Sequence, residues 1–291
     1  MPEFVFERGV SDSRIPAELD RSTPIWRYQD LPKFVWTLAN NSLWFARGDT
    51  FEDRFEGSTT QAVRNLYSQE LEAVVKDAAP GFVTEAMAWM TTQRRASKQN
   101  NVVNCWHMNE HESAAMWKLY ASAGQGVAIR SSIDRLLQSL PAGRASHPTD
   151  GSAGIRLLAD TSNRDSRGVS KVIAIDFGPV TYADYSDPVL TRRPGSREEY
   201  FRKRKSFEHE REFRALAFAL AVNSEGHVDL AVPVFPDGGV AVPVDLDVLV
   251  EGLFVVPGAP SWFTQTVEAT IERFGKRFPV RQSRLDEDPI F

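Results

Sequence analysis

Apolar residues along the chain recur with two different periods, one typical of helices and one typical of strands. Val63, Leu66 and Leu71 recur at helical spacing, and Pro80 interrupts this pattern before a second helical stretch begins. Upstream of them, Ser42–Ala46 is short, apolar and aromatic, as buried strands are. The first hundred residues therefore already combine helices with strands.

The rest of the pattern predicts helices and strands that interleave irregularly. The further predicted helices are Leu31–Ala39, Glu112–Ala121, Ser132–Leu140, Arg197–Lys205 and Pro260–Phe274. The further predicted strands are Asn101–Trp106, Gly126–Arg130, Lys171–Asp176, Pro179–Tyr182, Glu210–Leu220, Val228–Phe235, Gly252–Val256 and Phe278–Arg281. Several neighbouring strands are close enough in sequence to form hairpins, which favours α+β over a doubly wound parallel sheet. We predict an α+β fold with a mixed, mainly antiparallel sheet and flanking helices.

One long segment, Pro141–Gly168, shows little periodicity and is rich in Gly, Ser, Asp, Pro and Arg. Loops of this length inside a domain are often functional or disordered. A domain boundary there is the alternative, but each flanking half has too few strands to close a core alone. We therefore predict one domain, 1–291, with a surface insertion at 141–168.

Charge and composition narrow the function classes. The net charge is −5, whereas general nucleic-acid binders usually carry a strongly basic domain. The basic run Arg202–Lys205 is either a solvated helix end or a contact for a phosphate-bearing ligand. A single cysteine, Cys105, fits a reducing compartment, and the chain shows neither signal-peptide features nor an apolar stretch near ~18 residues. We expect a soluble, cytoplasmic protein with no membrane partner.

The acid-rich segment Glu208–Arg214 is the first candidate site. Side chains alternate between the faces of a strand, so Glu210, Glu212 and Arg214 would share one face. Paired carboxylates can divide acid and base roles or stabilise a developing sugar cation. The alternative is an exposed edge strand protected by charge.

An arginine between aromatic residues is the second candidate. In Ile25–Tyr28, Arg27 could hold a phosphate through two hydrogen bonds while Tyr28 or Trp26 stacks on a base. Alternatively, Arg27 pairs with a carboxylate beside a core aromatic residue.

Two further segments carry aromatic or acidic residues of interest. On the helix predicted at 112–121, Trp117 and Tyr120 are either core residues or the lining of a pocket for a flat ring. In the loop predicted at 50–57, Asp53 and Glu56 are better explained as turn caps than as catalytic groups.

Other common chemistries are not supported by motifs. Cys105, His107 and His111 match no standard zinc spacing, so we predict no metal site there. The chain also lacks a nucleophile elbow, a P-loop and a dinucleotide-binding fingerprint.

In their order and residue choice, several stretches resemble a bacterial family catalogued as domain of unknown function 2971. The matching stretches are Leu43–Ala46, Phe51–Glu56, Met116–Ala121, Gly126–Ile129, Lys205–Arg214 and Ser283–Leu285. The chain departs from the family pattern where Glu52 and Arg54 replace Asn and Pro, and where Phe207 replaces Trp. The resemblance spans about residues 25–285.

The order of an arginine-bearing strand, an aromatic helix and a Glu-x-Glu strand is also similar to ADP-ribosyltransferases. This similarity implies NAD as substrate, with Arg27 on its phosphates and Tyr120 or Trp117 stacked on nicotinamide. It implies that Glu212 is the catalytic carboxylate and that Glu210 orients the acceptor. The residues it implies for nucleotide binding are Arg27, Tyr28, Trp117, Tyr120 and Arg214.

The main expectation is therefore an NAD-consuming enzyme resembling ADP-ribosyltransferases, of the kind used as toxins or phage-defence effectors, acting on a protein or nucleic-acid acceptor. Fold-level analogy does not establish function, so two alternatives stay open. One is a non-catalytic module that binds a ligand or a partner. The other is a Mg²⁺-dependent nuclease that uses Glu210, Glu212, Asp53 and Lys205.

Overall fold

A computed structural model describes residues 10–11, 14–75, 81–121, 124–140, 170–186, 197–222, 228–229 and 233–287. Its strands are β1 Val10–Ser11, β2 Pro24–Asp30, β3 Ser42–Arg47, β4 Asn101–Met108, β5 Gly126–Ser132, β6 Ser170–Pro179, β7 Thr181–Ala183, β8 Arg202–Arg204, β9 Glu212–Val222, β10 Val228–Asp229, β11 Gly239–Pro243, β12 Gly252–Val255 and β13 Val280–Gln282. Its α-helices are α1 Leu31–Asn40, α2 Gln61–Val74, α3 Phe82–Ser97, α4 Ala114–Tyr120, α5 Ile133–Ser139, α6 Leu246–Leu249 and α7 Ser261–Arg273. Short 3-10 helices are η1 Gly48–Thr50, η2 Lys98–Asn100, η5 Glu198–Phe201, η6 Lys205–Glu210 and η7 Arg284–Asp286.

One large sheet forms the centre of the molecule. Its main path runs β1-β6-β9-β4-β2-β5-β12-β13, with β3 and β11 added beside β4 and β10 beside β9. Most neighbours pair antiparallel, whereas β1 with β6 and β12 with β13 pair parallel. The predicted α+β fold with a mixed, mainly antiparallel sheet and flanking helices is confirmed.

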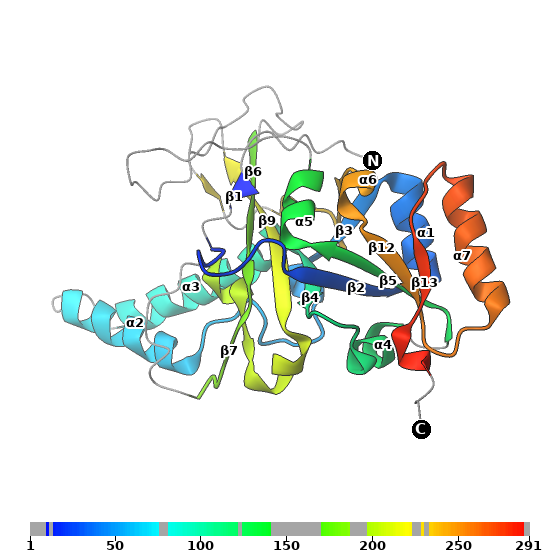
Figure 1. The fold of residues 1–291 in the computed structure, drawn as a ribbon. Helices are drawn as coiled ribbons and strands as arrows, with labels where there is room; N and C mark the ends of the chain where they lie inside the picture. Colours follow the sequence, from blue (N-terminus) through cyan, green and yellow to red (C-terminus); the bar gives the residue numbers. More distant parts are fainter. Residues whose placement is uncertain are drawn as a thin grey trace.

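Helices cover the β2-β5-β12 half of the sheet. In α1, the Asp30 side chain caps the first turn by accepting from the backbone N–H of Lys33, and Pro32 lies in that turn. Phe34 and Leu38 of α1 and Phe263 of α7 are buried in the main core. Figure 1 shows α1 and α7 together at one end of the molecule. This half is a packed support for the strands that carry the polar residues discussed below.

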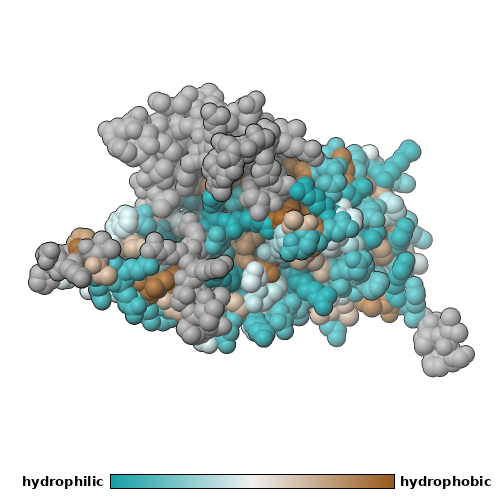
Figure 2. Space-filling view, turned by 60° about the vertical axis from the view of Figure 1, so that its left-hand side comes forward, coloured by the Kyte–Doolittle hydropathy of each residue, from teal (hydrophilic) through white to brown (hydrophobic). Residues whose placement is uncertain are grey.

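The opposite end of the molecule is a helical arm. Helices α2 and α3 pack against each other and extend away from the sheet, at the left of Figure 1. No described residue of α3 is fully buried, so the arm adds surface more than core. On the face seen in Figure 2, hydrophilic residues predominate and hydrophobic residues form small separate patches.

One predicted element before β9 is wrong, and β9 itself begins two residues later than predicted. The helix expected at Arg197–Lys205 is instead η5 followed by β8, because Arg202–Arg204 pairs in parallel with β7. The strand expected to include Glu210 begins only at Glu212, after the 3-10 helix η6. Charged residues suit a strand poorly, and here the tertiary contacts of Lys203 and Glu210 outweigh the alternating pattern.

One further predicted strand is confirmed only in part, and one observed strand had no prediction. Of the strand predicted at Val228–Phe235, only β10 is described as strand, and 233–235 are not. Strand β11 was not predicted. The proposed insertion at 141–168 lies outside the described residues.

Within the described part of the chain, none of the helices combines the length and apolar character required to traverse a bilayer.

Candidate functional site

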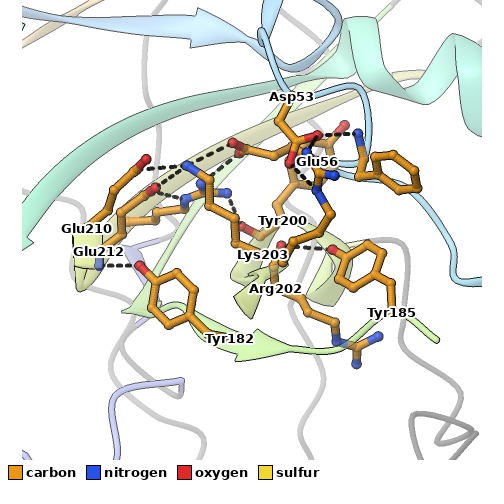
Figure 3. Close-up of polar contacts among 12 residues, drawn as sticks. Asp53, Glu56, Tyr182, Tyr185, Tyr200, Arg202, Lys203, Glu210 and Glu212 are labelled. Atoms are coloured by element: carbon orange, nitrogen blue, oxygen red, sulfur yellow. Dashed lines mark hydrogen bonds and ion pairs between the residues drawn. The ribbon is translucent and has the colours of Figure 1, made fainter. Parts of the chain in front are cut away.

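The ammonium group of Lys203 binds three carboxylates. Its Nζ lies 2.8 Å from Glu210 Oε2, 2.8 Å from Glu212 Oε1 and 3.1 Å from Glu56 Oε1. All four side chains are buried, with 5–8% of each exposed. Figure 3 shows Lys203 between Glu210 and Glu212 on one side and Glu56 on the other. Buried charges require partners of this kind, so the arrangement is internally compensated.

Arg214 closes the cluster from the side opposite Lys203. Its Nε donates to Glu212 Oε2 at 2.5 Å, and its Nη2 donates to Glu56 Oε2 at 2.7 Å. The remaining donor, Nη1, is bound to the carbonyl oxygen of Tyr200 at 2.7 Å. Glu212 and Glu56 are thus each shared between an ammonium and a guanidinium group, whereas Glu210 pairs with the ammonium of Lys203 and not with Arg214.

Arg211, which has a left-handed backbone conformation, separates Glu210 from Glu212 and allows both side chains to reach Lys203. Arg211 ends η6 with φ of 40°, and its carbonyl accepts from the backbone N–H of Met108 on β4. This turn re-enters the sheet at Glu212, whose backbone N–H donates to the hydroxyl of Tyr182 at 2.8 Å. Non-glycine residues with positive φ are uncommon and often lie near functional sites.

A close backbone approach fixes Glu56. Gly57 has φ of 62°, and a Cβ atom there would lie 2.7 Å from the ring of Tyr200. Tyr200 is also the residue whose carbonyl accepts from Arg214, so the loop and β9 share one anchor. Asp53 supports the same loop, since its carboxylate accepts from the backbone N–H of Phe55 and from two nitrogens of Arg204.

The two neighbouring glutamates differ in protonation. Burial and the hydrogen bond with Glu212 raise the pKa of Glu210 to about 7, against a smaller opposing effect of Lys203. Burial alone would raise the pKa of Glu212 too, but Arg214, the hydrogen bond from Glu210 and the charge of Lys203 hold it well below its usual value. Pairs of titratable groups with separated pKa values are a hallmark of acid–base sites. Glu210 can therefore exchange a proton near neutral pH beside an ionised Glu212.

The glutamates lie in the wall of a large cleft. The cleft has a volume of about 1430 Å³, which exceeds the ~300–1,000 Å³ typical of small-ligand sites. Its aromatic lining consists of Trp26, Tyr28, Trp36, Trp44, Phe51, Phe55, Trp106, Tyr120 and Phe207. Trp44, Phe55 and Tyr120 are at least 40% exposed, so their rings are available to a ligand. The site thus offers flat surfaces beside buried acid groups.

Arg27 supplies a positive charge in the same cleft. Its guanidinium is half-buried, and Nη1 donates to the carbonyl of Cys105 at 3.0 Å. Among the residues that the structure describes, it contacts no carboxylate. Burial lowers its pKa, opposed by the proximity of Cys105 and Tyr120. A half-buried cation with no anionic partner among the described residues can accept an anionic ligand.

Strand pairing brings Arg27 close to the glutamates. Trp26 pairs with His107 across β2 and β4, and His107 pairs with Glu212 across β4 and β9. Two strand spacings amount to about 10 Å between the Trp26 and Glu212 backbones. Arg27 is the residue after Trp26, and it lines the same cleft as Glu210 and Glu212.

Most of the other predicted site residues line the cleft, and Trp117 does not. Tyr120, Glu210, Glu212 and Arg214 line the cleft with Arg27. Tyr28 contributes to its floor but is only 6% exposed, and its hydroxyl accepts from the backbone N–H of Ser113.

Trp117 belongs to the core and is absent from the cleft lining. Its ring packs edge-on against Tyr28, with the ring centroids 4.9 Å apart, and its Nε1 donates to Glu112. Of the two aromatic residues proposed for stacking, only Tyr120 is accessible.

Sequence reasoning did not identify Lys203 and Glu56 as site residues. In the sequence, Lys203 belongs to the basic run Arg202–Lys205. In the structure the side chains of this run have different surroundings, since Lys203 is buried, Arg204 pairs with Asp53 and Lys205 is exposed. Glu56 was interpreted as a turn cap, a role that Asp53 fills. For Glu56 the available signal was its position in Phe51–Glu56, one of the stretches on which the resemblance to the family of unknown function rests.

Cys105 and His107 also line the cleft, but neither is assigned a role in the chemical step. Burial, followed by the charge of Glu212, raises the pKa of the Cys105 thiol, which keeps it protonated. Burial lowers the pKa of His107, whose Nδ1 lies 2.6 Å from the carbonyl of Glu210 and therefore donates to it. The ring of His107 thus helps to fix the backbone of Glu210.

Among the described residues, no group of three or more His, Cys, Asp and Glu side chains is arranged to hold a metal ion. The carboxylates that the nuclease alternative assigned to Mg²⁺ are already bound by cations: Asp53 by Arg204, and Glu210 and Glu212 by Lys203. Because cationic side chains of the protein already neutralise these carboxylates, the arrangement favours a carboxylate pair held by Lys203 over a metal centre.

No protein-family model, curated protein or solved structure matches this chain.

Proposed function

We propose that the cleft binds NAD and that the protein is an ADP-ribosyltransferase-like enzyme that breaks the bond between nicotinamide and ribose. The observation that carries this proposal is the pairing of a neutral-range acid, Glu210, with ionised Glu212 in a cleft that also contains Arg27, a cation with no carboxylate partner among the described residues. A dinucleotide presents a diphosphate, two flat rings and a bond whose cleavage develops positive charge. The cleft has a complementary group for each.

Arg27 is assigned to the diphosphate and Tyr120 to a ring. The guanidinium of Arg27 has free donors beyond the single bond to Cys105, and guanidinium groups bind phosphates through paired hydrogen bonds. Tyr120 lines the same cleft as Glu210 and Glu212, and 44% of it is exposed. A nicotinamide stacked on Tyr120 would lie beside the two carboxylates.

The carboxylates divide the chemical step. As the bond between ribose C1′ and the nicotinamide nitrogen breaks, its electron pair moves to that nitrogen and the sugar becomes cationic. The negative charge of Glu212, fixed by Lys203 and Arg214, stabilises this cation. An acceptor hydroxyl then bonds to C1′ and gives its proton to ionised Glu210. Each group is preorganised by the ion cluster, so little rearrangement is required.

Nicotinamide release from NAD is the direct test, with NAD-induced thermal stabilisation measured alongside. The informative variant is Glu210→Gln, a near-isosteric change at the group with the weakest ionic fixation, and Glu208→Gln at an exposed neighbour is the matched control. We expect Glu210→Gln to melt at or above the wild-type temperature and to keep NAD binding, but to lose turnover by at least about a hundredfold, as removal of a general base does. Glu212→Gln is less informative because it also breaks pairs with Lys203 and Arg214.

Two outcomes would count against the enzyme. Wild-type protein that neither binds nor consumes NAD, with protein and nucleic-acid acceptors supplied, would remove the proposal. Wild-type protein that binds NAD without turnover would leave the non-catalytic binding module, in which the ion cluster has a structural role only.

A further inference from the structure

A second, basic pocket lies between the helical arm and the loop that carries Glu56. It has a volume of about 260 Å³ and is open to the surface. Its residues come from the loop after η1, from α2 and from α3: Arg54, Gly57, Ser58, Thr59, Arg64, Tyr67, Met87, Met90, Thr91, Arg94, Arg95 and Lys98. Five of these side chains are cationic and none is acidic.

Three of the cations are uncompensated. Arg54, Arg64 and Arg95 are exposed and form no ion pair within the described part of the chain. Arg94, by contrast, pairs with Glu199 at 3.3 Å and packs over the ring of Tyr67 at 5.2 Å. In a chain of net charge −5, three unpaired arginines around one hollow form a local positive surface.

Lys98 connects this pocket to the loop that carries Glu56, a residue of the main cleft. Its Nζ donates to the carbonyl oxygens of Arg54 and Glu56, at 3.3 and 2.7 Å. Tyr67, Met87 and Met90 add half-buried apolar surface between the charges. The pocket therefore has a fixed floor as well as a charged rim.

The pocket and the cleft are contiguous at Arg54, which lines both. Next along the loop, Phe55 is 48% exposed on the cleft side and has Arg204 over its ring at 4.6 Å. Arg54 and the accessible ring of Phe55 thus lead from the arm into the cleft. A compact anion would fill only one end of this track, whereas a flexible polyanion with flat bases complements all of it.

We infer that the pocket between α2, α3 and the 54–59 loop binds a single-stranded nucleic acid, which it directs along Arg54 into the cleft. Arg64 and Arg95 would contact phosphates, and Phe55 would stack on a base. The role of this strand as the ADP-ribose acceptor rests on the proposed function. Its binding does not, and it is tested without NAD.

The experiment is fluorescence anisotropy with labelled single-stranded DNA and RNA of about 12 nucleotides, within the usual single-strand site sizes. The test variant is Arg64→Gln with Arg95→Gln. The control is Arg273→Gln with Arg277→Gln, two exposed arginines at the far end of the chain that change the net charge equally. All variants are compared by melting curves, and Arg54→Gln alone probes the connection between pocket and cleft.

Wild-type protein should bind the strand with an affinity that falls steeply with salt. The Arg64/Arg95 variant should bind at least about tenfold more weakly, and its log–log salt slope should be smaller by about 1.4, since each lost phosphate contact removes about 0.7. No binding by wild type at low salt, an equal loss in the Arg273/Arg277 control, or complete competition by an equimolar amount of pyrophosphate would each overturn the inference. Failure of NAD turnover alone would affect only the proposed function.

Discussion

The carboxylates of Glu210 and Glu212 lie at equal distances of 2.8 Å from one ammonium group, although only Glu212 belongs to a strand. Alternation along a strand would have placed the two side chains on one face about 7 Å apart. The left-handed turn at Arg211 instead brings them together on Lys203. This convergence produces the separated pKa values and, with them, the chemistry proposed for the cleft.

Removing the ammonium group should destabilise the fold strongly. Lys203→Met leaves Glu56, Glu210 and Glu212 buried without their shared cation, and breaking a buried pair on one side typically costs ~3–5 kcal/mol. Lys205→Met, at an exposed neighbour, should change the free energy of unfolding by less than about 0.5 kcal/mol. Urea unfolding of both variants at pH 7 measures the difference. Similar stabilities would show that the cluster is solvated in solution.

The raised pKa of Glu210 predicts a pH dependence of stability. With a folded-state pKa of about 7 against an ordinary 4.5, the folded protein retains a proton that the unfolded chain has released. The free energy of unfolding should therefore fall as the pH rises from about 4.5 through about 7, by about 3 kcal/mol at ~1.4 kcal/mol per pKa unit.

Glu210→Gln isolates this contribution. The amide does not titrate, so the difference in unfolding free energy between wild type and variant should change across that pH interval and level off above it. Burial raises the pKa of Glu199 too, but that contribution is common to both proteins and cancels in the difference. A difference that is independent of pH from 4.5 to 8 would contradict the assignment of the proton to Glu210. Lowered carboxyl pKa values, such as that of Glu212, act below pH 4.5 with the opposite sign.

Much of the fold followed from local signals in the sequence. Asp30 with Pro32 marked the start of α1, and Pro80–Gly81 marked the break before α3, because caps and breakers act through neighbouring residues. Strand β8 escaped prediction because three charged residues become a strand only through pairing with β7. Local propensity carries no information about that partner.

The site was predictable only in part for the same reason. Arg27 stood out as a charge between aromatic residues, and Glu210, Glu212 and Arg214 stood out as charges at the start of a predicted strand, where local rules fail. Glu56 is 158 positions from the Arg214 that binds it, and its role depends on the tertiary approach of the loop to β9.

Strain at Arg211 can be measured with two substitutions. Both Arg211→Gly and Arg211→Val remove an exposed side chain, so they differ mainly in the cost of the left-handed conformation. For an L-residue this conformation costs ~1–2 kcal/mol, and β-branching increases the strain. The valine variant should unfold at least about 1 kcal/mol more easily than the glycine variant in urea. Equal stabilities would show that residue 211 relaxes to negative φ.

Arg27 should be important for binding and dispensable for folding. Its guanidinium is half-buried, has one hydrogen bond to a neutral carbonyl and, in the described part of the chain, no carboxylate. A desolvated charge without a counter-charge is unfavourable, so Arg27→Met, which keeps the length and apolar character of the side chain, should leave the melting temperature unchanged or raise it.

The same substitution removes the cation proposed to bind the diphosphate, and thermal stabilisation by NAD should be lost. A ligand at ~100 times its dissociation constant contributes about 2.7 kcal/mol, which is readily detected. Arg130→Met is the control, because Arg130 pairs with Glu251 and does not itself line the cleft; it should keep the NAD response. If Arg27→Met melted well below wild type, Arg27 would be a structural residue that already has a partner in the ligand-free protein. The anionic ligand would then have to bind elsewhere in the cleft.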